Sequence, residues 1–237
     1  MTDPIIALIP ARAGSERVKH KNTRPFAGIP GGLLELKLRQ LTAVPEVAKV
    51  IVSSNDPVVL DYVARWGRET DSRFVASERP DELGRSSTSM TDFIRYSATL
   101  EAEGVMMMTH VTHPFITSAV FREIIASWRA AVARGHDSLV TVTRLHKFIW
   151  DENGPWNYDN SVEKWPRSQD LKPLFEINHA AYLMPFALMR EVGDRIGRRP
   201  FLHELPENVA MDIDWEDQFQ LLGDIAEAKR ARGISLI

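Results

Sequence analysis

The sequence contains no cysteine, and this absence excludes several kinds of chemistry. A chain without thiols forms no disulfides, has no cysteine nucleophile and holds no metal through cysteine sulfur. The apolar run near its start, Ile5 to Ile9, is far shorter than a membrane-spanning helix requires. No basic n-region precedes that run, so we expect no signal peptide, no membrane partner and a cytoplasmic protein.

An excess of positive charge is absent as well. The formal net charge is -3, and the 26% of charged residues form no basic helix or stripe. This balance argues against a nucleic-acid partner. The hydrophobic share of 44% is sufficient for a full core, so we expect a single domain over residues 1–237 with one extension.

Strand-like and helix-like patterns alternate through the first 143 residues. Such alternation is typical of repeated βα units, which build a mostly parallel sheet. We expect strands at residues 5–9, 49–54, 105–110, 138–142 and 180–185, and a closing helix at residues 216–231. The sequence therefore predicts an α/β protein, in which the methionines of the 105–110 strand pack in the core.

Two inner helices carry recognisable signals. The first follows Asp56, which suits an N-cap, and Pro57, which suits the first turn, and we expect Gly67 to end it. The second follows Ser118 and is expected to stop at Gly135. Its buried stripe is expected to contain Phe121, Ile124, Ile125, Trp128 and Val132.

The alternation breaks between residues 144 and 178. Pro, Asn, Asp and Gly are frequent there, together with three of the six tryptophans, Trp150, Trp156 and Trp165. A loop-rich stretch of this length is uncommon in a compact domain unless it is functional, and exposed aromatic side chains commonly mark a partner surface. We interpret residues 144–178 as an inserted extension used in dimerisation and expect a homodimer. The alternative is a self-packed loop whose tryptophans face the parent domain.

The first expected strand opens into a loop that runs to Asn22. Its small residues are Ala11, Ala13, Gly14 and Ser15, and its cations are Arg12, Arg17, Lys19 and Lys21. Small residues let backbone N–H groups approach phosphate oxygens, and the cations can neutralise a polyphosphate. Neither the Walker motif nor the dinucleotide fingerprint is present. The loop predicts triphosphate binding, with a solvated basic turn as the alternative.

A second chemical cluster is the sequence MDIDWED near the C-terminus. Its spacing places the carboxylates of Asp212 and Asp214 on the same face of an extended strand. Magnesium prefers oxygen ligands and commonly links one or two carboxylates to substrate phosphates, so this pair complements the basic loop. Alternatively, Asp214 is the N-cap of the closing helix, with Glu216 and Asp217 in its first turn.

The segment from Ile9 to Asn22 reproduces the pattern I-P-A-R-x-G-S-x-x-[IV]-x-x-K-N. With it, the chain resembles the acylneuraminate cytidylyltransferases, also called CMP-sialic acid synthetases, over nearly its whole length. The resemblance implies a three-layer sandwich with a Rossmann-like nucleotide-diphospho-sugar transferase sheet, CTP as co-substrate and Mg²⁺ as cofactor. It also implies that Arg12 and Lys21 hold the triphosphate, and that Asn22 helps to position the nucleotide. The other nucleotide-binding residues expected in this loop are Ala11, Gly14 and Ser15.

Further blocks of the chain resemble the same family. The pattern R-P-x-E-L begins at Arg79 and is followed by a Ser/Thr-rich turn, which implies that Arg79, Ser87 and Ser89 flank the cytosine. The family's sugar-site block is matched in part, with Arg167, Gln169, Asn178 and Tyr182 as the expected substrate contacts. The terminal D-I-D block implies that Asp212 and Asp214 hold catalytic magnesium.

The chain also departs from the family. Where the family's central strand ends in L-L-Q-P-T-S-P, this chain reads MMTHVTHP, so His110 replaces a glutamine that faces the acceptor sugar and His113 replaces a serine. Ser86 stands for an aspartate, and His179 for a glycine. His110 and His113 could be metal ligands, but without a third ligand nearby we assign them hydrogen bonds, with His110 as a substrate contact.

The reaction implied is nucleotidyl transfer, in which a hydroxyl of a 2-keto sugar acid attacks the α-phosphorus of CTP and expels pyrophosphate. Arg12, Lys21, Asp212 and Asp214 are the expected catalytic residues. If the extension folds over the cleft of a neighbouring subunit, Arg167 is expected to bind the carboxylate of the sugar acid, because a guanidinium matches a carboxylate bidentately. The alternatives are a CMP-Kdo-type synthetase, a nucleotidylyltransferase for another acceptor, and a catalytically silent nucleotide-binding paralogue.

Overall fold

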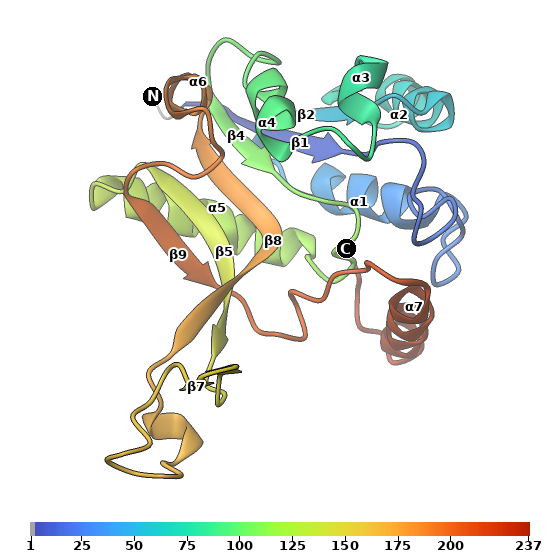
Figure 1. Cartoon of the computed structure of the whole chain (residues 1–237). Helices are drawn as coiled ribbons and strands as arrows, with labels where there is room; N and C mark the ends of the chain where they lie inside the picture. Colours follow the sequence, from blue (N-terminus) through green and yellow to red (C-terminus); the bar gives the residue numbers. More distant parts are fainter. Residues whose placement is uncertain (1–2) are drawn as a thin grey trace.

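The computed structural model describes residues 3–237, and its centre is a seven-stranded sheet (Figure 1). In space, the strands lie in the order β3-β2-β1-β4-β8-β5-β9. Their bounds are β1 Ile5–Pro10, β2 Val47–Ser54, β3 Phe74–Glu78, β4 Val105–Met108, β5 Ser138–Leu145, β8 Leu174–Pro185 and β9 Pro200–Glu204. The helices are α1 Gly32–Thr42, α2 Pro57–Glu69, α3 Asp81–Gly84, α4 Met90–Ser97, α5 Ser118–Ala133, α6 Phe186–Val192 and α7 Glu216–Ala231.

Most neighbouring strands of this sheet are parallel. β1 pairs in parallel with β2 and β4, β2 with β3, and β5 with β9, while β8 runs antiparallel between β4 and β5. Helices cover both faces of the sheet (Figure 1). The predicted Rossmann-like α/β sandwich with a mostly parallel sheet is therefore confirmed. Within residues 3–237, no helix combines the length and the apolar character needed to cross a membrane.

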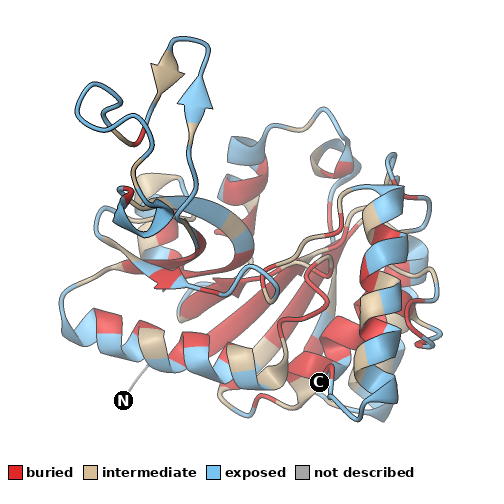
Figure 2. Cartoon of the chain, turned by 90° about the horizontal axis from the view of Figure 1, so that it is seen from below, coloured by how far each residue is buried: buried red, intermediate tan, exposed pale blue. Residues whose placement is uncertain are grey.

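The sequence of β1 shows why this sheet is buried on both faces. Ile5, Ala7 and Ile9 join a core cluster with α1, α5 and α7, whereas Ile6 and Leu8 join a second cluster with α4 and α6. Successive side chains of a strand point to opposite faces, so a strand covered on both sides requires a continuous apolar run. The three methionines of β4 are divided between the same two clusters, as core residues. The buried strands lie at the centre of Figure 2.

Helix α2 begins as predicted and ends later. The Asp56 carboxylate accepts a hydrogen bond of 2.9 Å from the Val58 N–H, and Pro57 occupies the first turn. The prediction that Gly67 ends the helix is wrong, because α2 continues to Glu69. A Cβ at Gly67 would lie 2.5 Å from the Phe74 carbonyl oxygen. The glycine therefore permits close packing of the helix against the start of β3.

Helix α5 follows its predicted stripe except at one position. Phe121, Ile124, Ile125 and Trp128 are buried, but Val132 is 46% exposed. Ala131 takes the buried place near the end of the helix. The prediction continued the stripe four residues after Trp128, whereas the buried position lies three residues after it.

The segment 144–178 projects from the sheet (Figure 1). β5 and β8 remain paired as far as Leu145 and Leu174, so the strand expected at residues 180–185 begins earlier and forms one side of a stalk. Beyond the stalk lie the small hairpin of β6 Trp150–Asp151 and β7 Gly154–Pro155, and the 3-10 turn η1 Ser168–Asp170. The three tryptophans of this segment have exposed fractions of 54% to 66%, so they do not pack against the parent domain as the alternative interpretation required.

Candidate active site

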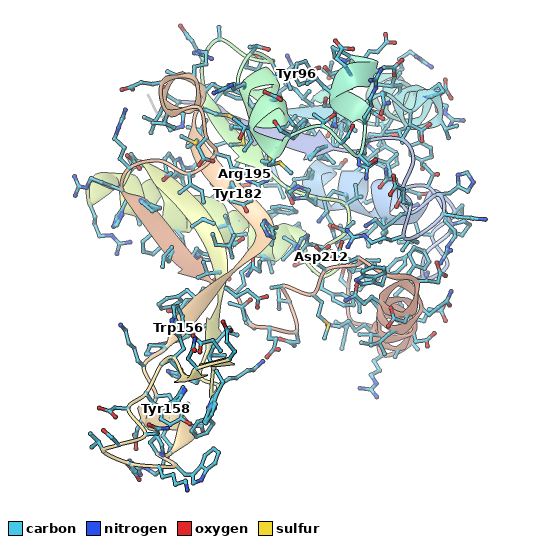
Figure 3. All side chains as sticks on the ribbon, in the orientation of Figure 1. Tyr96, Trp156, Tyr158, Tyr182, Arg195 and Asp212 are labelled. Carbon is cyan, nitrogen blue, oxygen red and sulfur yellow. The ribbon has the colours of Figure 1, made fainter. Side chains whose placement is uncertain are left out.

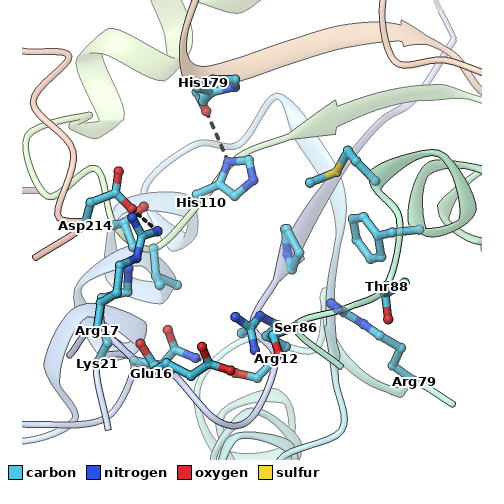
Figure 4. Close-up of a pocket in the computed structure, with 18 of the residues that line it drawn as sticks. Arg12, Glu16, Arg17, Lys21, Arg79, Ser86, Thr88, His110, His179 and Asp214 are labelled. Atoms are coloured by element: carbon cyan, nitrogen blue, oxygen red, sulfur yellow. Dashed lines mark hydrogen bonds and ion pairs between the residues drawn. The ribbon is translucent and has the colours of Figure 1, made fainter. Parts of the chain in front are cut away.

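The main pocket, of about 590 Å³, opens at the carboxyl ends of β1, β3 and β4 (Figure 4). Ligands of open α/β sheets bind at this edge, because the loops that follow parallel strands converge there. Strand β8, the connection from α6 to β9 and the segment before α7 complete the walls. The charged and histidine side chains of the lining are Arg12, Glu16, Arg17, Lys21, Arg79, Arg85, His110, His179, Arg195, Asp212 and Asp214.

The loop after β1 forms one side of this pocket. Ala11, Arg12, Ser15, Lys21 and Asn22 line the main pocket, while Gly14 lines an adjoining cavity of about 160 Å³. Gly14 has a φ of 69°, a left-handed conformation that favours glycine. The Arg12 guanidinium reaches the Gly14 carbonyl at 3.1 Å, which folds the loop around its own cation. The structure therefore brings the predicted phosphate-binding residues together at a pocket wall.

Two contacts join this loop to the aspartate segment. Lys21 Nζ donates to the Ile213 carbonyl at 2.8 Å, and Arg17 pairs with Asp214 at 2.6 Å. Burial lowers the pKa of Lys21, although the nearby carboxylates of Asp212 and Asp214 oppose this effect. Figure 4 shows the ion pair between Arg17 and Asp214 beside Lys21. Residues almost two hundred positions apart therefore form one charged wall.

Asp212 and Asp214 lie on either side of the buried Ile213, so partly exposed and buried side chains alternate here as predicted. The segment is nevertheless not paired as a strand. Helix α7 begins at Glu216 with Trp215 as its N-cap, so the alternative role of Asp214 as N-cap is wrong. The side chain of Gln218 instead accepts hydrogen bonds from the backbone N–H groups of Asp214 and Trp215. Both carboxylates consequently line the pocket.

Asp212 has an unpaired oxygen beside a buried histidine. His113 Nε2 donates to the Asn178 carbonyl at 2.7 Å, which leaves Nδ1 as an acceptor in the neutral ring. Burial lowers the pKa of His113, so the neutral form is favoured. Its Nδ1 lies 3.7 Å from Asp212 Oδ1, and both buried atoms lack a hydrogen-bond partner among residues 3–237. Two facing acceptors leave a place for a proton or a cation between them.

Magnesium fits this donor set through the carboxylates. Burial opposes the charge of Asp212, but His113, Thr112, His110 and Lys21 outweigh it and hold its pKa below the ordinary value. An ionised carboxylate is the ligand that a hard divalent cation prefers. Within residues 3–237, no three His, Asp or Glu side chains are arranged so that they could bind one metal ion together. Substrate oxygens and water would therefore have to complete a magnesium shell.

Arg79 lines the pocket and is held in place by strand β2 and helix α4. It is 4% exposed, its guanidinium donates to the Ser53 carbonyl at 2.7 Å, and it lies 4.4 Å from the centre of the Phe93 ring. Burial lowers its pKa to about 10. Arg79 therefore fixes the pocket wall through these contacts.

The Ser/Thr-rich turn reaches the pocket through other residues than predicted. Ser86 and Thr88 line it, whereas Ser87 and Ser89 do not. Ser89 instead caps helix α4, because its hydroxyl accepts a hydrogen bond from the Asp92 N–H at 3.1 Å. The two expected serines are thus each one position away from a lining residue.

At the opposite end of the pocket, His110 Nδ1 contacts the His179 carbonyl at 3.1 Å (Figure 4). Burial lowers the pKa of His110 to about 3, so its ring is neutral near pH 7. The predicted hydrogen-bonding role of both His110 and His113 therefore agrees with the contacts. His179 has a φ of 60°, which explains why a glycine would suit this position.

Other predicted substrate contacts lie outside the pocket. Arg167 and Gln169 belong to the extension, where Arg167 pairs with Asp170 at 2.6 Å and is 72% exposed. Asn178 contacts Thr143, and Tyr182 is buried beneath His179. Arg167 thus lies outside the pocket of its own chain, and its contact with the cleft of a neighbouring subunit stays a prediction.

Sequence reasoning missed Arg195. It follows Gly193, which ends α6 with a φ of 69°, and it lies 4.1 Å from the centre of the Tyr182 ring. Figure 3 shows Arg195 next to Tyr182, which belongs to β8. An arginine shortly after a helix-ending glycine carries no motif, so only the topology reveals its position.

Solved structures with a similar fold include CMP:2-keto-3-deoxy-manno-octonic acid synthetase complexed with CTP. It has a TM-score of 0.64 and 16% identity over 97% of this chain and 99% of that chain. The 4-diphosphocytidyl-2C-methyl-D-erythritol synthase of Anaerococcus prevotii also has a TM-score of 0.64, with 14% identity over the same shares. At such identities, the similarity establishes the fold alone.

Similar curated sequences are N-acylneuraminate cytidylyltransferases of fish. The protein of Oncorhynchus mykiss is 28% identical over 89% of this chain and 48% of its own length. The A form of Danio rerio is 26% identical over 89% of this chain and 49% of its own length. The chain thus spans about half the length of these relatives. The family profile described as Cytidylyltransferase matches residues 6–170, which is more than half of the sequence, and the chain therefore belongs to the cytidylyltransferase family.

Proposed function

We propose that this protein is a CTP-dependent cytidylyltransferase that activates a sialic-acid-like 2-keto sugar acid and releases pyrophosphate. The observation that carries the proposal is the charged wall in which Arg12 and Lys21 lie with Asp212 and Asp214 around one pocket. Cations suit a triphosphate, and paired carboxylates suit the divalent cation that accompanies it. The wall therefore supplies both kinds of group that nucleotidyl transfer requires.

In the proposed reaction, a hydroxyl of the acceptor attacks the α-phosphorus of CTP, and the bond to the β-phosphate oxygen breaks. The hydroxyl proton is released, and pyrophosphate leaves without a covalent enzyme intermediate. Arg12 and Lys21 would hold the phosphates in place and stabilise the charge on the leaving group. Lys21 is itself positioned by the Ile213 carbonyl at 2.8 Å, which sets the distance between the two halves of the wall.

Asp212 and Asp214 would hold magnesium in this proposal. The unpaired, buried Oδ1 of Asp212 supports such a role, because a bound cation would satisfy it. When bound, magnesium would neutralise charge on the phosphates of CTP. Arg17 already neutralises Asp214 in part, and we expect this contact to change when a nucleotide enters.

The sialic-acid-like acceptor is supported by the fish relatives, which are N-acylneuraminate cytidylyltransferases. A Kdo-type acceptor is the second candidate, since a CMP:2-keto-3-deoxy-manno-octonic acid synthetase shares the fold. His110 lines the pocket at the position where the resembling family has a glutamine, and this change favours an acceptor that differs from N-acetylneuraminate in the group next to that position. Both candidates are 2-keto sugar acids, so the reaction is the same.

The extension would serve a homodimer. Its exposed aromatic and aliphatic side chains include Trp150, Trp156, Trp165 and Val162. Figure 3 shows Trp156 and Tyr158 on the projecting part, away from the sheet. Exposed apolar groups gathered on a projection are typical of a surface that another chain covers. Light scattering measures the molar mass of the wild type and of a Trp156→Ser and Trp165→Ser double variant. We expect a dimeric wild type and a weakened dimer in the variant, and a monomeric wild type would contradict the proposal.

Pyrophosphate release tests the proposed reaction. The purified protein is incubated with CTP, magnesium and a panel of N-acetylneuraminate, legionaminate, pseudaminate, Kdo and a phosphonate. Release with any of the sugar acids supports the proposal and identifies the acceptor. If CTP raises the melting temperature while no acceptor causes release, the silent nucleotide-binding alternative is favoured. ATP and GTP in place of CTP serve as controls for the nucleotide.

A further inference from the structure

Arg195 lines the pocket and forms no ion pair with any other residue of the described range 3–237. Its Nη2 lies 3.5 Å from His179 Nδ1 and its Nη1 lies 3.6 Å from Met108 Sδ, and both contacts are long and weak. Among residues 3–237, no carboxylate lies within ion-pair distance of its guanidinium. The adjacent Asp194 carboxylate accepts the backbone N–H of Arg195 instead. Most of the five donors of this guanidinium are therefore unused.

The surroundings hold Arg195 in place and reduce its hydration. Its guanidinium lies over the Tyr182 ring at 4.1 Å, in a cation–π contact. Burial lowers the pKa of Arg195, since the charged form loses contact with water, but an arginine remains charged at neutral pH. A guanidinium that is stacked on an aromatic face keeps its N–H edge for a planar anion.

His179 adds a second donor to the same place. Its Nδ1 lies 2.5 Å from the Tyr182 hydroxyl and 3.5 Å from Arg195; a guanidinium only donates and a hydroxyl can donate, so we assign Nδ1 as the acceptor. Burial, followed by the charge of Arg195, lowers the pKa of His179. The neutral ring therefore carries its proton on Nε2. A non-glycine residue with a φ of 60° is strained, and such strain is concentrated at functional sites.

Topology places these donors away from the phosphate loop. The loop follows β1, whereas His179 belongs to β8 and Arg195 to the connection from α6 to β9, and β4 separates β1 from β8 in the sheet. A triphosphate held by Arg12 and Lys21 thus occupies the β1 side. The group that reaches Arg195 belongs to the second substrate.

We infer that Arg195, with His179 beside it, binds the anionic group of the acceptor, a carboxylate or a phosphonate, and that this contact determines acceptor specificity. The inference rests on the proposed function, because it assumes that the pocket takes an acceptor as well as CTP. It assigns to Arg195 of the same chain a role that the sequence suggested for Arg167 reaching in from a neighbouring subunit. Tyr182 acts as a positioning residue, because it holds the guanidinium and the histidine ring without lining the pocket.

The test compares each accepted sugar acid with its neutral methyl ester in the wild type and in Arg195→Gln. The wild type is expected to prefer the acid in kcat/KM by about 30-fold, since a charge-assisted bidentate contact is lost in the ester. Arg195→Gln is expected to lower that preference to nearly one while leaving the KM for CTP within about twofold. Arg195→Lys is expected to restore part of the preference, because it keeps the charge but not the planar fork.

Arg198→Gln is the matched control. Arg198 lies in the same connection, is exposed and pairs with Glu191 at 2.8 Å. The Arg198→Gln variant is expected to keep both the preference for the acid over the ester and the KM for CTP of the wild type. Melting temperatures with and without CTP show that each variant is folded and binds nucleotide.

The outcomes separate this inference from the proposed function. A wild type that turns over sugar acids, with an Arg195→Gln variant that keeps the preference for the acid, overturns the inference alone. A rise in the KM for CTP without a change in acid preference also overturns it, because Arg195 would then bind the nucleotide phosphates. A wild type that neither releases pyrophosphate nor binds any acid in titrations with CTP and magnesium overturns the proposed function, and the inference with it.

Discussion

The two ends of the pocket are built differently. At the end proposed to bind the nucleotide, one continuous loop after β1 supplies Arg12, Lys21 and Asn22. At the end proposed to bind the acceptor, His110 follows β4, His179 lies on β8 and Arg195 follows α6. The first end is a local structure with a sequence pattern, whereas the second exists only because the sheet brings distant segments together.

This difference has a chemical meaning. The nucleotide end retains the pattern expected for CTP, while the acceptor end has histidines at three positions where the resembling family has other residues. A fold can keep one binding site and vary another, because function depends on the site and not on the fold. We therefore expect substitutions at the two ends to have separable effects on CTP and on the acceptor.

The largest effect is expected for Asp212→Asn. The amide keeps the shape of the side chain but removes the charge that a divalent cation needs, so kcat should fall by about 10³-fold. CTP should still raise the melting temperature, because the phosphate loop is intact. Pyrophosphate release and thermal shift measure the two effects. Asp217→Asn, in the exposed first turn of α7, is the control, and unchanged turnover in Asp212→Asn would disprove the metal assignment.

The next largest effect is expected for Arg12→Ala, at the nucleotide end. Loss of a cation that binds phosphate should raise the KM for CTP by about 30-fold, with a smaller change in the KM for the acceptor. Steady-state kinetics with each substrate varied in turn measure both constants. Arg65→Ala, on the outer surface of α2, should leave both unchanged. Wild-type affinity for CTP in Arg12→Ala would contradict the phosphate-loop assignment.

Much of the fold could be predicted from local patterns. The apolar run of β1, the N-cap Asp56 and the buried stripe of α5 each depend on neighbouring residues, and each is confirmed apart from Val132. Gly67 was misread because a glycine near a helix end usually terminates it, whereas here it accommodates the start of β3. A contact between segments cannot be seen in the spacing of one of them.

The candidate site divides in the same way. The phosphate loop and the aspartate pair could be found from sequence, although their connection through Lys21 and Ile213 could not. Ser87 and Ser89 were one position away from the lining residues, because the direction of a side chain in a turn depends on its backbone conformation. Arg195 carries no pattern at all, and only strand order places it beside His179.

A smaller effect is expected for His110→Gln, which gives this chain the glutamine of the resembling family. One hydrogen bond at the acceptor end changes, so kcat/KM for individual acceptors should shift by about tenfold and their order should change. The KM for CTP should stay within about twofold. The acceptor panel measures the order, with His146→Gln in the exposed extension as the control. An equal change for every acceptor and for CTP would show that His110 does not distinguish acceptors.

The smallest effect is expected for Lys37→Met, beneath the acceptor end. Lys37 is fully buried, its Nζ donates to the His113 carbonyl at 3.0 Å, and it lies 5.0 Å from the centre of the Phe121 ring. The variant loses the hydrogen bond that holds residues 110–113, the segment that lies beside Asp212. The KM for the acceptor should rise by about two- to threefold, in line with one lost hydrogen bond, while the KM for CTP should not change.

The burial of Lys37 also leads to a prediction of how the free energy of unfolding depends on pH. Burial lowers its pKa to about 7 from an ordinary value of 10.5. Between these values the unfolded chain holds a proton that the folded chain has lost, so the free energy of unfolding should rise with pH by at most about 1.4 kcal/mol per unit. Lys37→Met should remove this rise, whereas the exposed Lys172→Met should keep it. Urea unfolding at pH 6.5, 8 and 9.5 measures the slope, and equal slopes in the wild type and Lys37→Met would show that Lys37 is charged in the folded protein over this range.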